Sequence, residues 1–427
     1  MQALAKRNMW HIILGGTIGN LNEWYNFLLY GYLASTISQL FFPSKNSLLS
    51  LTLTFTVFAL SFFVRPLGGV LFGWIGDTYG RQRALILSLV MMGVPTLLIG
   101  CLPTYDSIGL ASPILLCLLR ISQGLSAGGE HTGSAVYIAE YAPASRRSLW
   151  VSTVPTSAAL GILISSTASL LIINSFSQQQ LLAWGWRVGY WAGAALCLVS
   201  ILLRITMPET PYFRNRQNEK MERKRYPVSA LLKDHRVFKN LLIVIGLASC
   251  WGIFYQILFI WMPTYLTNVQ HYSHEFALQV NSFYILCLAC LVLMFGYVSD
   301  YINRKAILYA SCIAMAILAY PLFVMFSSGS ISQVYIAMGT FTFIFSLFLP
   351  TAFVSMVESF DTLNRYTGLS FGFNIGLAVF GGTCPLIATW LIEMTKNNSS
   401  PAIYMILASC FALWTSTHIQ EKRGQPI

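Results

Sequence analysis

The chain has 427 residues, of which 56% are hydrophobic and only 10% are charged, and its mean hydropathy is +0.62. A soluble domain carries about 25% charged residues, so this composition excludes a soluble protein and predicts one that lies in a lipid bilayer. The formal net charge of +11 could suggest nucleic-acid binding. However, the basic residues lie in short stretches between apolar runs, which is how membrane topology is encoded, and we expect no nucleic-acid partner.

Twelve apolar runs are long enough to cross a membrane, which takes about 20 residues per helix. They cover residues 11–37, 50–75, 83–102, 111–139, 148–173, 186–206, 239–266, 277–299, 305–326, 331–357, 367–393 and 400–417. The first run follows a basic start, but it is too long for a signal-peptide core and it contains Glu23, so we expect it to be retained. The nine cysteines show no CxxC spacing, which favours small buried hydrophobic residues over a metal site.

The basic residues predict the orientation of the chain. An even number of spans puts both termini on one side of the membrane. The loops on that side hold most of the basic residues: Lys6, Arg7, Arg81, Arg83, Arg146, Arg147, the cluster from Arg214 to Lys239, Arg304, Lys305, Arg365, Lys422 and Arg423. The opposite loops offer little beyond Lys45, Arg187 and Lys396. Because basic loops stay in the cytoplasm, both termini are predicted to be cytoplasmic.

A polar, charged stretch from Met207 to Arg236 separates the sixth and seventh runs. It predicts an N-terminal half over 1–206, a cytoplasmic linker over 207–238, a C-terminal half over 239–417 and a tail over 418–427. The segment from Asn215 to Arg225 is either a short amphipathic helix on the membrane surface or, as we favour, a solvated charge run. The other loops are short and carry no nucleotide-binding, metal or nucleophile motif, so we expect no enzyme and no cofactor.

A loop motif occurs twice in the chain. It reads Gly73-Trp-Ile-Gly-Asp77-Thr-Tyr-Gly80-Arg81-Gln-Arg and, 223 residues later, Gly296-Tyr-Val-Ser-Asp300-Tyr-Ile-Asn303-Arg304-Lys. Each copy predicts a tight hairpin between two membrane helices, with the acid at a helix end where it can face the arginine. Gly80 suits a left-handed turn, and asparagine, as at 303, is the residue most able to replace glycine there. Two copies at half-chain separation predict two homologous halves.

The first copy closely resembles the loop between helices 2 and 3 of the major facilitator superfamily, and the second resembles the weaker copy between helices 8 and 9. Other stretches resemble the metabolite:proton symporter family, which includes proline/betaine, oxoglutarate, citrate and shikimate carriers. These stretches are Gly19 to Tyr25, Arg65 to Gly69, Arg120 to Gly133, Trp184 to Arg187, Pro208 to Pro211 and Arg365 to Gly368. The resemblance spans about residues 10 to 417. It implies an all-α integral membrane protein with twelve transmembrane helices in two pseudo-symmetric six-helix bundles.

Charged residues at membrane depth are candidates for transport, because each costs at least about 2.5–3.5 kcal/mol there. In the N-terminal runs they are Glu23, Arg65, Arg120 and Glu130, with His131 beside the last. Arg120 and Glu130 are ten residues apart on one helix, about 15 Å, so they cannot pair with each other. Glu23 could approach either of them. We predict Glu23 and Glu130 as proton-coupling residues, and the alternative is a static Glu23–Arg120 pair that fixes helix packing.

One departure from the family pattern bears on coupling. The family usually has an aspartate three residues after the helix-1 glutamate, whereas this chain has Asn26. Asparagine forms hydrogen bonds but does not titrate near neutral pH. Either Glu23 or Glu130 therefore carries the proton, or coupling works differently.

Polar and aromatic residues on helices 1, 4, 7 and 11 are predicted to bind the substrate, since the resemblance implies that helices 1, 7 and 11 line a central cavity. They are Tyr25, Asn26, Tyr30, Arg120, Trp251, Tyr255, Gln256 and Asn374. Aromatic faces favour a quaternary ammonium and Arg120 favours a carboxylate, so a zwitterion satisfies both. Individual aromatic residues near helix ends could instead be interfacial anchors.

Charged residues at the predicted cytoplasmic helix ends are interpreted as an inner gate, whose ion pairs close one state and break when the halves move. Its predicted members are Asp77, Gly80, Arg81, Arg146, Arg147, Asp300, Arg304, Glu358, Asp361 and Arg365. A solvated loop charge is the alternative for each of them.

These features predict a monomeric secondary transporter in a bacterial inner membrane. It would import a small organic zwitterion or carboxylate with a proton by alternating access. An efflux carrier or an uncoupled exchanger is the alternative, and a non-transporting membrane sensor is disfavoured because the loops and tail leave no room for a signalling domain. Osmosensory members of the family would continue into a C-terminal coiled coil, and since no heptads follow Trp414 we do not expect that regulation.

Overall fold

The computed structural model describes residues 2–218 and 233–425, and within these ranges it contains helices and no strand. The chain forms two compact units. Unit 1 comprises Met1–Tyr141 and Ser157–Arg225, and unit 2 comprises Ala142–Thr156 and Tyr226–Ile427. Helix α8 (Arg147–Ser175) therefore begins in unit 2 and continues in unit 1.

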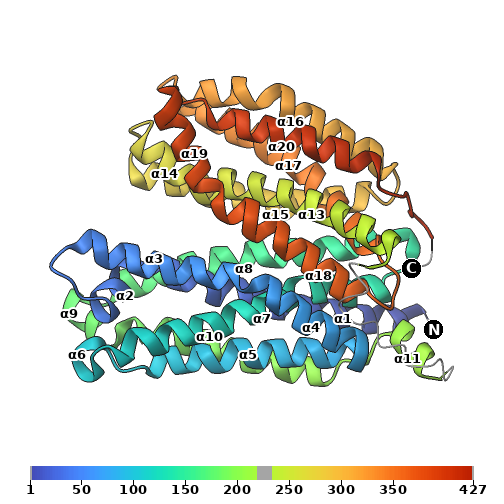
Figure 1. Cartoon of the computed structure of the whole chain (residues 1–427), viewed down its shortest axis with the longest axis horizontal. Coiled ribbons are helices and arrows are strands. Elements are labelled where there is room, and N and C mark those ends of the chain that lie inside the picture. Colours follow the sequence, from blue (N-terminus) through green and yellow to red (C-terminus); the bar gives the residue numbers. More distant parts are fainter. Residues whose placement is uncertain (1, 219–232, 426–427) are drawn as a thin grey trace. The chain divides into compact units, whose positions relative to one another are not determined.

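The helices of unit 1 follow the apolar runs of the sequence closely (Figure 1). Besides the later part of α8 they are α1 (Gln2–Tyr32), α2 (Ala34–Phe41), α3 (Ser47–Phe63), α4 (Arg65–Tyr79), α5 (Arg81–Cys101), α6 (Tyr105–Ile108), α7 (Ala111–Tyr141), α9 (Gln178–Gln180), the π-helical turn η2 (Leu181–Gly185), α10 (Arg187–Ile205) and α11 (Pro211–Asn218). The first predicted run is thus divided into α1 and α2, and the second into α3 and α4.

Helix α7 is the central helix of unit 1, because it packs against α1, α3, α4 and α5. Its small residues permit this close packing. A Cβ on Gly128 would overlap the Arg65 carbonyl, and one on Gly68 of α4 would overlap the Leu125 carbonyl, so the backbones of α4 and α7 are in contact. The polar side chains of α7 consequently face other helices and are buried.

Unit 2 has the same kind of architecture. Its elements are η1 (Ala144–Arg146), α13 (His235–Tyr255), the π-helical η3 (Gln256–Trp261), α14 (Met262–Asn268), α15 (His274–Val298), α16 (Arg304–Phe326), α17 (Ile331–Glu358), α18 (Arg365–Gly376), the π-helical η4 (Leu377–Gly381), α19 (Gly382–Thr395) and α20 (Pro401–Thr417). Helix α16 packs along α20 and α17, and α13, which is yellow-green in Figure 1, packs along α18 and α20.

The helices are long and apolar enough for a multi-pass membrane protein. Nine helical segments of the described ranges qualify as membrane spans by length and composition, and α20 is a shorter apolar helix. With α1 and α7 they account for all twelve predicted runs, so the twelve-helix prediction is confirmed. Large apolar side chains such as Leu67, Ile317 and Leu386 are exposed on the outside of their units, as lipid-facing residues must be.

The two loop motifs differ at their turn residues. Gly80 has φ 119° and ψ 147°, a conformation that disfavours any side chain, as predicted. Asn303 has φ −58°, so the prediction of a left-handed asparagine is wrong. Its side chain instead accepts a hydrogen bond from the N–H of Ala306 at 3.3 Å and caps α16, a role that needs no positive φ. In the linker, α11 covers the start of the predicted charge run, and residues 219–225 of that run lie outside the described residues.

Candidate functional site

Glu23 and Arg65 form a buried acid–arginine pair in unit 1. Arg65 Nη2 lies 3.2 Å from Glu23 Oε1, and both side chains are 1% exposed. The guanidinium also lies 5.5–5.7 Å from the ring centroids of Trp24, Phe27 and Phe62. Glu23 Oε2 has no hydrogen-bond partner among the described residues. This carboxylate is therefore only half satisfied.

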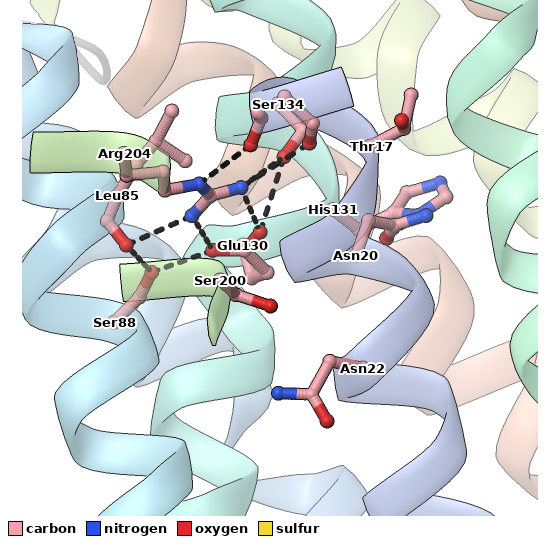
Figure 2. A network of polar contacts seen from close by, with 12 residues as sticks. Thr17, Asn20, Asn22, Leu85, Ser88, Glu130, His131, Ser134, Ser200 and Arg204 are labelled. Carbon is pink, nitrogen blue, oxygen red and sulfur yellow. Dashed lines mark hydrogen bonds and ion pairs between the residues drawn. The ribbon is translucent and has the colours of Figure 1, made fainter. Parts of the chain in front are cut away.

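Glu130 and Arg204 form another such pair, which joins α7 to α10 (Figure 2). Arg204 Nη1 donates to Glu130 Oε2 at 2.7 Å, and Nη2 donates to Oε1. The hydroxyl of Ser88 donates to Oε2 at 2.7 Å, and that of Ser134 donates to Oε1 at 3.2 Å. Both oxygens of Glu130 therefore accept two hydrogen bonds each.

Arg204 also donates to the backbones of two further helices. Its Nε donates to the Gly15 carbonyl at 2.9 Å and its Nη2 to the Gly16 carbonyl at 3.2 Å, both on α1. Its Nη1 donates to the Leu85 carbonyl of α5 at 2.9 Å. Sequence reasoning missed Arg204, because an arginine in the last turn of an apolar run looks like a cytoplasmic end residue. Its long side chain reaches back into the bundle instead.

His131 does not belong to the Glu130 network. Figure 2 shows its ring beside Asn20 and Thr17, directed away from the Glu130 carboxylate. Its Nδ1 lies 2.8 Å from Asn20 Oδ1, and the amide nitrogen of Asn20 donates to Ser157 at 2.8 Å. His131 therefore helps to hold α7, α1 and α8 together within unit 1.

Arg120 is fully buried, and no carboxylate pairs with it among the described residues. Its Nη1 donates to Gln123 Oε1 at 2.7 Å and its Nη2 to the Ser61 hydroxyl at 3.2 Å, while Nε has no hydrogen-bond partner in the described part of the chain. The structure pairs Glu23 with Arg65, so the static Glu23–Arg120 pair does not form.

Aromatic rings surround the Arg120 guanidinium. The ring centroids of Tyr30, Phe27 and Phe58 lie 4.5, 4.8 and 5.6 Å from its central carbon. The Tyr30 hydroxyl is bound to the Thr54 carbonyl at 3.1 Å. Of the predicted substrate residues in unit 1, the structure thus brings Tyr30 and Arg120 together.

Tyr25 and Asn26 face α10 instead. The Tyr25 hydroxyl donates to the Gly189 carbonyl at 3.0 Å. The amide nitrogen of Asn26 donates to Asn22 Oδ1 at 2.7 Å, and its oxygen lies so close to Gly193 that a Cβ there would overlap it. Both side chains contribute to the packing of α1 on α10.

The predicted substrate residues of unit 2 lie on α13, on η3, which continues it, and on α18. Trp251 of α13 packs against Phe353 and Phe373, with ring centroids 5.2 and 4.5 Å away. Asn374, next to Phe373, donates to the Ser370 carbonyl of its own helix at 2.7 Å.

Tyr255 is the last residue of α13, and Gln256 is the first residue of the π-helical segment η3. The Tyr255 ring packs against Phe259 at 5.5 Å. Gln256 is buried, and its Oε1 accepts no hydrogen bond within the described ranges. A polar side chain is thus buried at the point where α13 passes into η3.

The first loop motif of unit 1 is the centre of a buried charge cluster. Arg81 Nη1 lies 2.6 Å from Asp77, and Nη2 lies 3.2 Å from Glu140. Thr210 donates to the other oxygen of Glu140 at 2.6 Å. Glu209 accepts from the first two N–H groups of α5 at 3.1 and 3.2 Å and so caps that helix. Burial raises the pKa of Glu209, and these backbone hydrogen bonds oppose the rise.

The second loop motif forms a matching cluster in unit 2. Arg304 lies 3.5 Å from Asp300 and also binds Glu358, which Arg147 binds at 2.6 Å. Asp300 accepts from the N–H groups of Ser148 and Leu149 at 2.9 Å and so caps α8. Burial is the largest influence on Asp300 and raises its pKa.

The two clusters correspond position by position. Asp77 matches Asp300, Arg81 matches Arg304, Glu140 matches Glu358, and Glu209 matches Glu421, whose Oε2 accepts from the N–H of Arg304 at 2.9 Å. Sequence reasoning missed Glu140, Glu209 and Glu421. A signal was present for the first, because Glu140 precedes Arg147 by seven residues as Glu358 precedes Arg365.

The predicted gate arginines Arg146 and Arg365 differ in their exposure to solvent. Arg146 is exposed, and its neighbour Arg147 makes the contact with Glu358. Arg365 is buried at the start of α18, where its Nε donates to the Phe360 carbonyl at 3.2 Å.

Residues 13–383 match the family model described as Major Facilitator Superfamily. The chain belongs to the major facilitator superfamily. It is 32% identical over 422 residues to the glycine betaine/proline/ectoine/pipecolic acid transporter OusA of Dickeya dadantii (strain 3937), covering 97% of this chain and 84% of that protein. It is 30% identical over 421 residues, with the same coverage, to the proline/betaine transporter of Escherichia coli (strain K12).

Solved structures support the same fold. The proton:xylose symporter XylE bound to 6-bromo-6-deoxy-D-glucose has a TM-score of 0.78 at 18% identity, covering 98% of both chains. The transporter FucP in its outward conformation has a TM-score of 0.71 at 16% identity, covering 95% of this chain and 98% of FucP. The family, the relatives and the apolar helices together identify a multi-pass membrane transporter, and they point away from an enzyme.

Proposed function

We propose that this protein imports a small zwitterion of the proline or betaine class together with a proton, by alternating access. The observation that carries the proposal is Arg120, a fully buried guanidinium with no carboxylate partner among the described residues. A buried charge without a counter-ion is strongly disfavoured. The carboxylate of a bound zwitterion would supply that counter-ion, and the names of the relatives, which include proline and glycine betaine, support this class.

The geometry favours Glu23 over Glu130 as the proton site. Glu23 makes one contact of 3.2 Å to Arg65 and leaves Oε2 without a partner among the described residues. Glu130 accepts four hydrogen bonds, two of them from Arg204. A carboxylate with an open oxygen and a single ionic contact can gain a proton with little rearrangement, whereas a proton on either oxygen of Glu130 would compete with two donors already bound there.

We also propose the orientation that the basic loops predict, with both termini in the cytoplasm of a bacterial cell and the protein in the inner membrane. The bacterial origin of the relatives supports this setting.

Uptake of labelled proline and glycine betaine into proteoliposomes under an imposed pH gradient tests the proposal. Arg120→Lys keeps the charge but loses the planar fork that binds a carboxylate in two places, and we expect uptake to fall at least about tenfold. Arg187→Lys is the matched control, because within the described residues the Arg187 guanidinium donates to the backbone carbonyls of Gly100 and Leu102 and to no side chain. Its uptake should stay near wild type. Wild-type rates in Arg120→Lys would rule out the carboxylate site.

The same assay separates the alternatives. An uncoupled exchanger would show counterflow of substrate with no response to the pH gradient. An efflux carrier would accumulate substrate only in vesicles of inverted orientation.

A further inference from the structure

We propose that Arg204 is a positioning residue for proton coupling: it is held by Glu130, anchors the backbone of α1 at Gly15 and Gly16, and so fixes the rotation of α1 that presents Glu23 to Arg65. This inference rests on the proposed function, in which Glu23 carries the proton. We call the Glu130–Arg204 pair and its two α1 carbonyls the α1 clasp.

The hydrogen bonds of Arg204 show that the clasp reaches α1 as well as Glu130. The Nη1 and Nη2 atoms bind the two carboxylate oxygens, which neutralises the pair. The contacts of Nε with Gly15 and of Nη2 with Gly16 do not involve Glu130. A helix carbonyl has a second lone pair beyond the one used in the helix, so these contacts add an anchor without breaking α1.

The clasp touches the face of α1 that carries Glu23. Residues four apart lie on one face of a helix, and Gly15, Gly19 and Glu23 follow that spacing. A Cβ on Gly19 would lie 2.5 Å from both Arg204 Nη2 and Glu130 Oε1, so the clasp rests directly against Gly19. Glu23 follows one turn later, about 6 Å along the axis.

The Glu23–Arg65 contact depends on the rotation of α1. Arg65 belongs to α4 and is also held by α7, because its Nη2 donates to the Ala127 carbonyl at 3.2 Å. Glu23 reaches it with one oxygen only. A slip of α1 by one residue would turn Glu23 by about 100°, so α1 must be held in register for the pair to form. The clasp provides an anchor on the same face of the helix.

Two variants remove the clasp in different ways. Arg204→Lys keeps a cation beside Glu130 but cannot bind two carboxylate oxygens and two carbonyls at once. The double change Glu130→Met with Arg204→Met removes both charges and leaves no uncompensated buried charge, and such replacements are often neutral for stability. Thr17→Val is the control, because Thr17 lies on α1 near the clasp (Figure 2) and, in the part of the chain that the structure describes, its hydroxyl bonds to the Ile13 carbonyl of its own helix alone.

Each variant is assayed in proteoliposomes for uphill proline uptake driven by a pH gradient and for proline counterflow, alone and combined with Glu23→Gln. We expect uphill uptake to fall at least fivefold while counterflow stays within twofold of wild type. Thr17→Val should match wild type in both assays. In the Glu23→Gln background, which lacks uphill uptake, the clasp variants should leave counterflow within twofold of Glu23→Gln alone, because Arg204 acts through Glu23.

Three outcomes would overturn the inference: wild-type uphill uptake in either clasp variant, an equal loss of uphill uptake and counterflow, or failure of both variants to fold, which would make the clasp purely structural. A different result would refute the proposed proton site itself: Glu23→Gln alone would accumulate proline as wild type does.

Discussion

Glu23 and Glu130 are both buried opposite an arginine, yet their surroundings differ in the number of donors. Glu23 has one contact to Arg65 and an open oxygen in the described structure, whereas Glu130 has four donors. The four donors fix Glu130 between its neighbouring helices, whereas the open oxygen of Glu23 is available for a new contact. At the scale of single residues, the number of hydrogen-bond donors therefore distinguishes Glu23, our proposed proton site, from Glu130, our proposed anchor.

Replacing each glutamate by glutamine should give opposite results. Glu23→Gln removes titration but keeps the shape, so uphill uptake should be lost while counterflow and thermal stability in detergent are kept. Glu130→Gln leaves Arg204 buried without a counter-charge, which costs about 3–5 kcal/mol, so its melting temperature and yield should fall markedly. If Glu130→Gln melts like wild type and Glu23→Gln remains coupled, the two roles are assigned the wrong way round.

The sequence predicts which residues are charged at depth but not their partners. Glu23, Arg65, Arg120 and Glu130 stand out because each interrupts an apolar run. The pairing of Glu23 with Arg65 instead of Arg120 depends on how α1 is rotated against α4 and α7, and no spacing along the chain encodes that rotation. The role of Arg204 could not be predicted for a related reason: its long side chain places the guanidinium far from its backbone position in the last turn of α10.

At the scale of elements, the loop between α4 and α5 combines a turn, a helix cap and an ion-pair cluster. Gly80 makes the turn, Glu209 caps α5, and Arg81 is shared between Asp77 and Glu140. The glycine and the acid are readable in the sequence. Glu209 could not be predicted as the cap of α5, because it lies more than a hundred residues from that helix in the sequence.

Asp77→Asn should slow transport without unfolding the protein. Arg81 keeps its contacts with Glu140 and with the Gly76 carbonyl at 2.7 Å, so the loop remains anchored. The change removes the 2.6 Å ion pair that we interpret as part of the gate. We expect expression within twofold of wild type and an initial uptake rate at least about fivefold lower. Asp106→Asn, an exposed acid in α6, is the control; equal rates for all three proteins would refute the gate.

At the scale of the whole molecule, the internal repeat extends from two loop residues to four charged positions in each unit. The sequence reveals Asp77 with Asp300 and Arg81 with Arg304, because these lie within short matching motifs. The match of Glu140 with Glu358 and of Glu209 with Glu421 becomes visible only when the helices are packed. Because Glu421 follows α20, the end of the described chain takes part in the charge cluster of unit 2.

The repeat and the basic loops together predict which residues face the cytoplasm. Single cysteines at Arg146, Asp361 and Lys45, introduced after replacing the nine native cysteines, test this orientation. All three positions are exposed, and Asp361 is a better probe than the neighbouring Arg365, which is buried. In intact cells a membrane-impermeant thiol reagent should label position 45 and leave positions 146 and 361 unlabelled until the membrane is permeabilised. Labelling of all three from one side would contradict the assignment, because residues 45 and 146 are separated by three predicted spans and an odd number of crossings must put them on opposite faces.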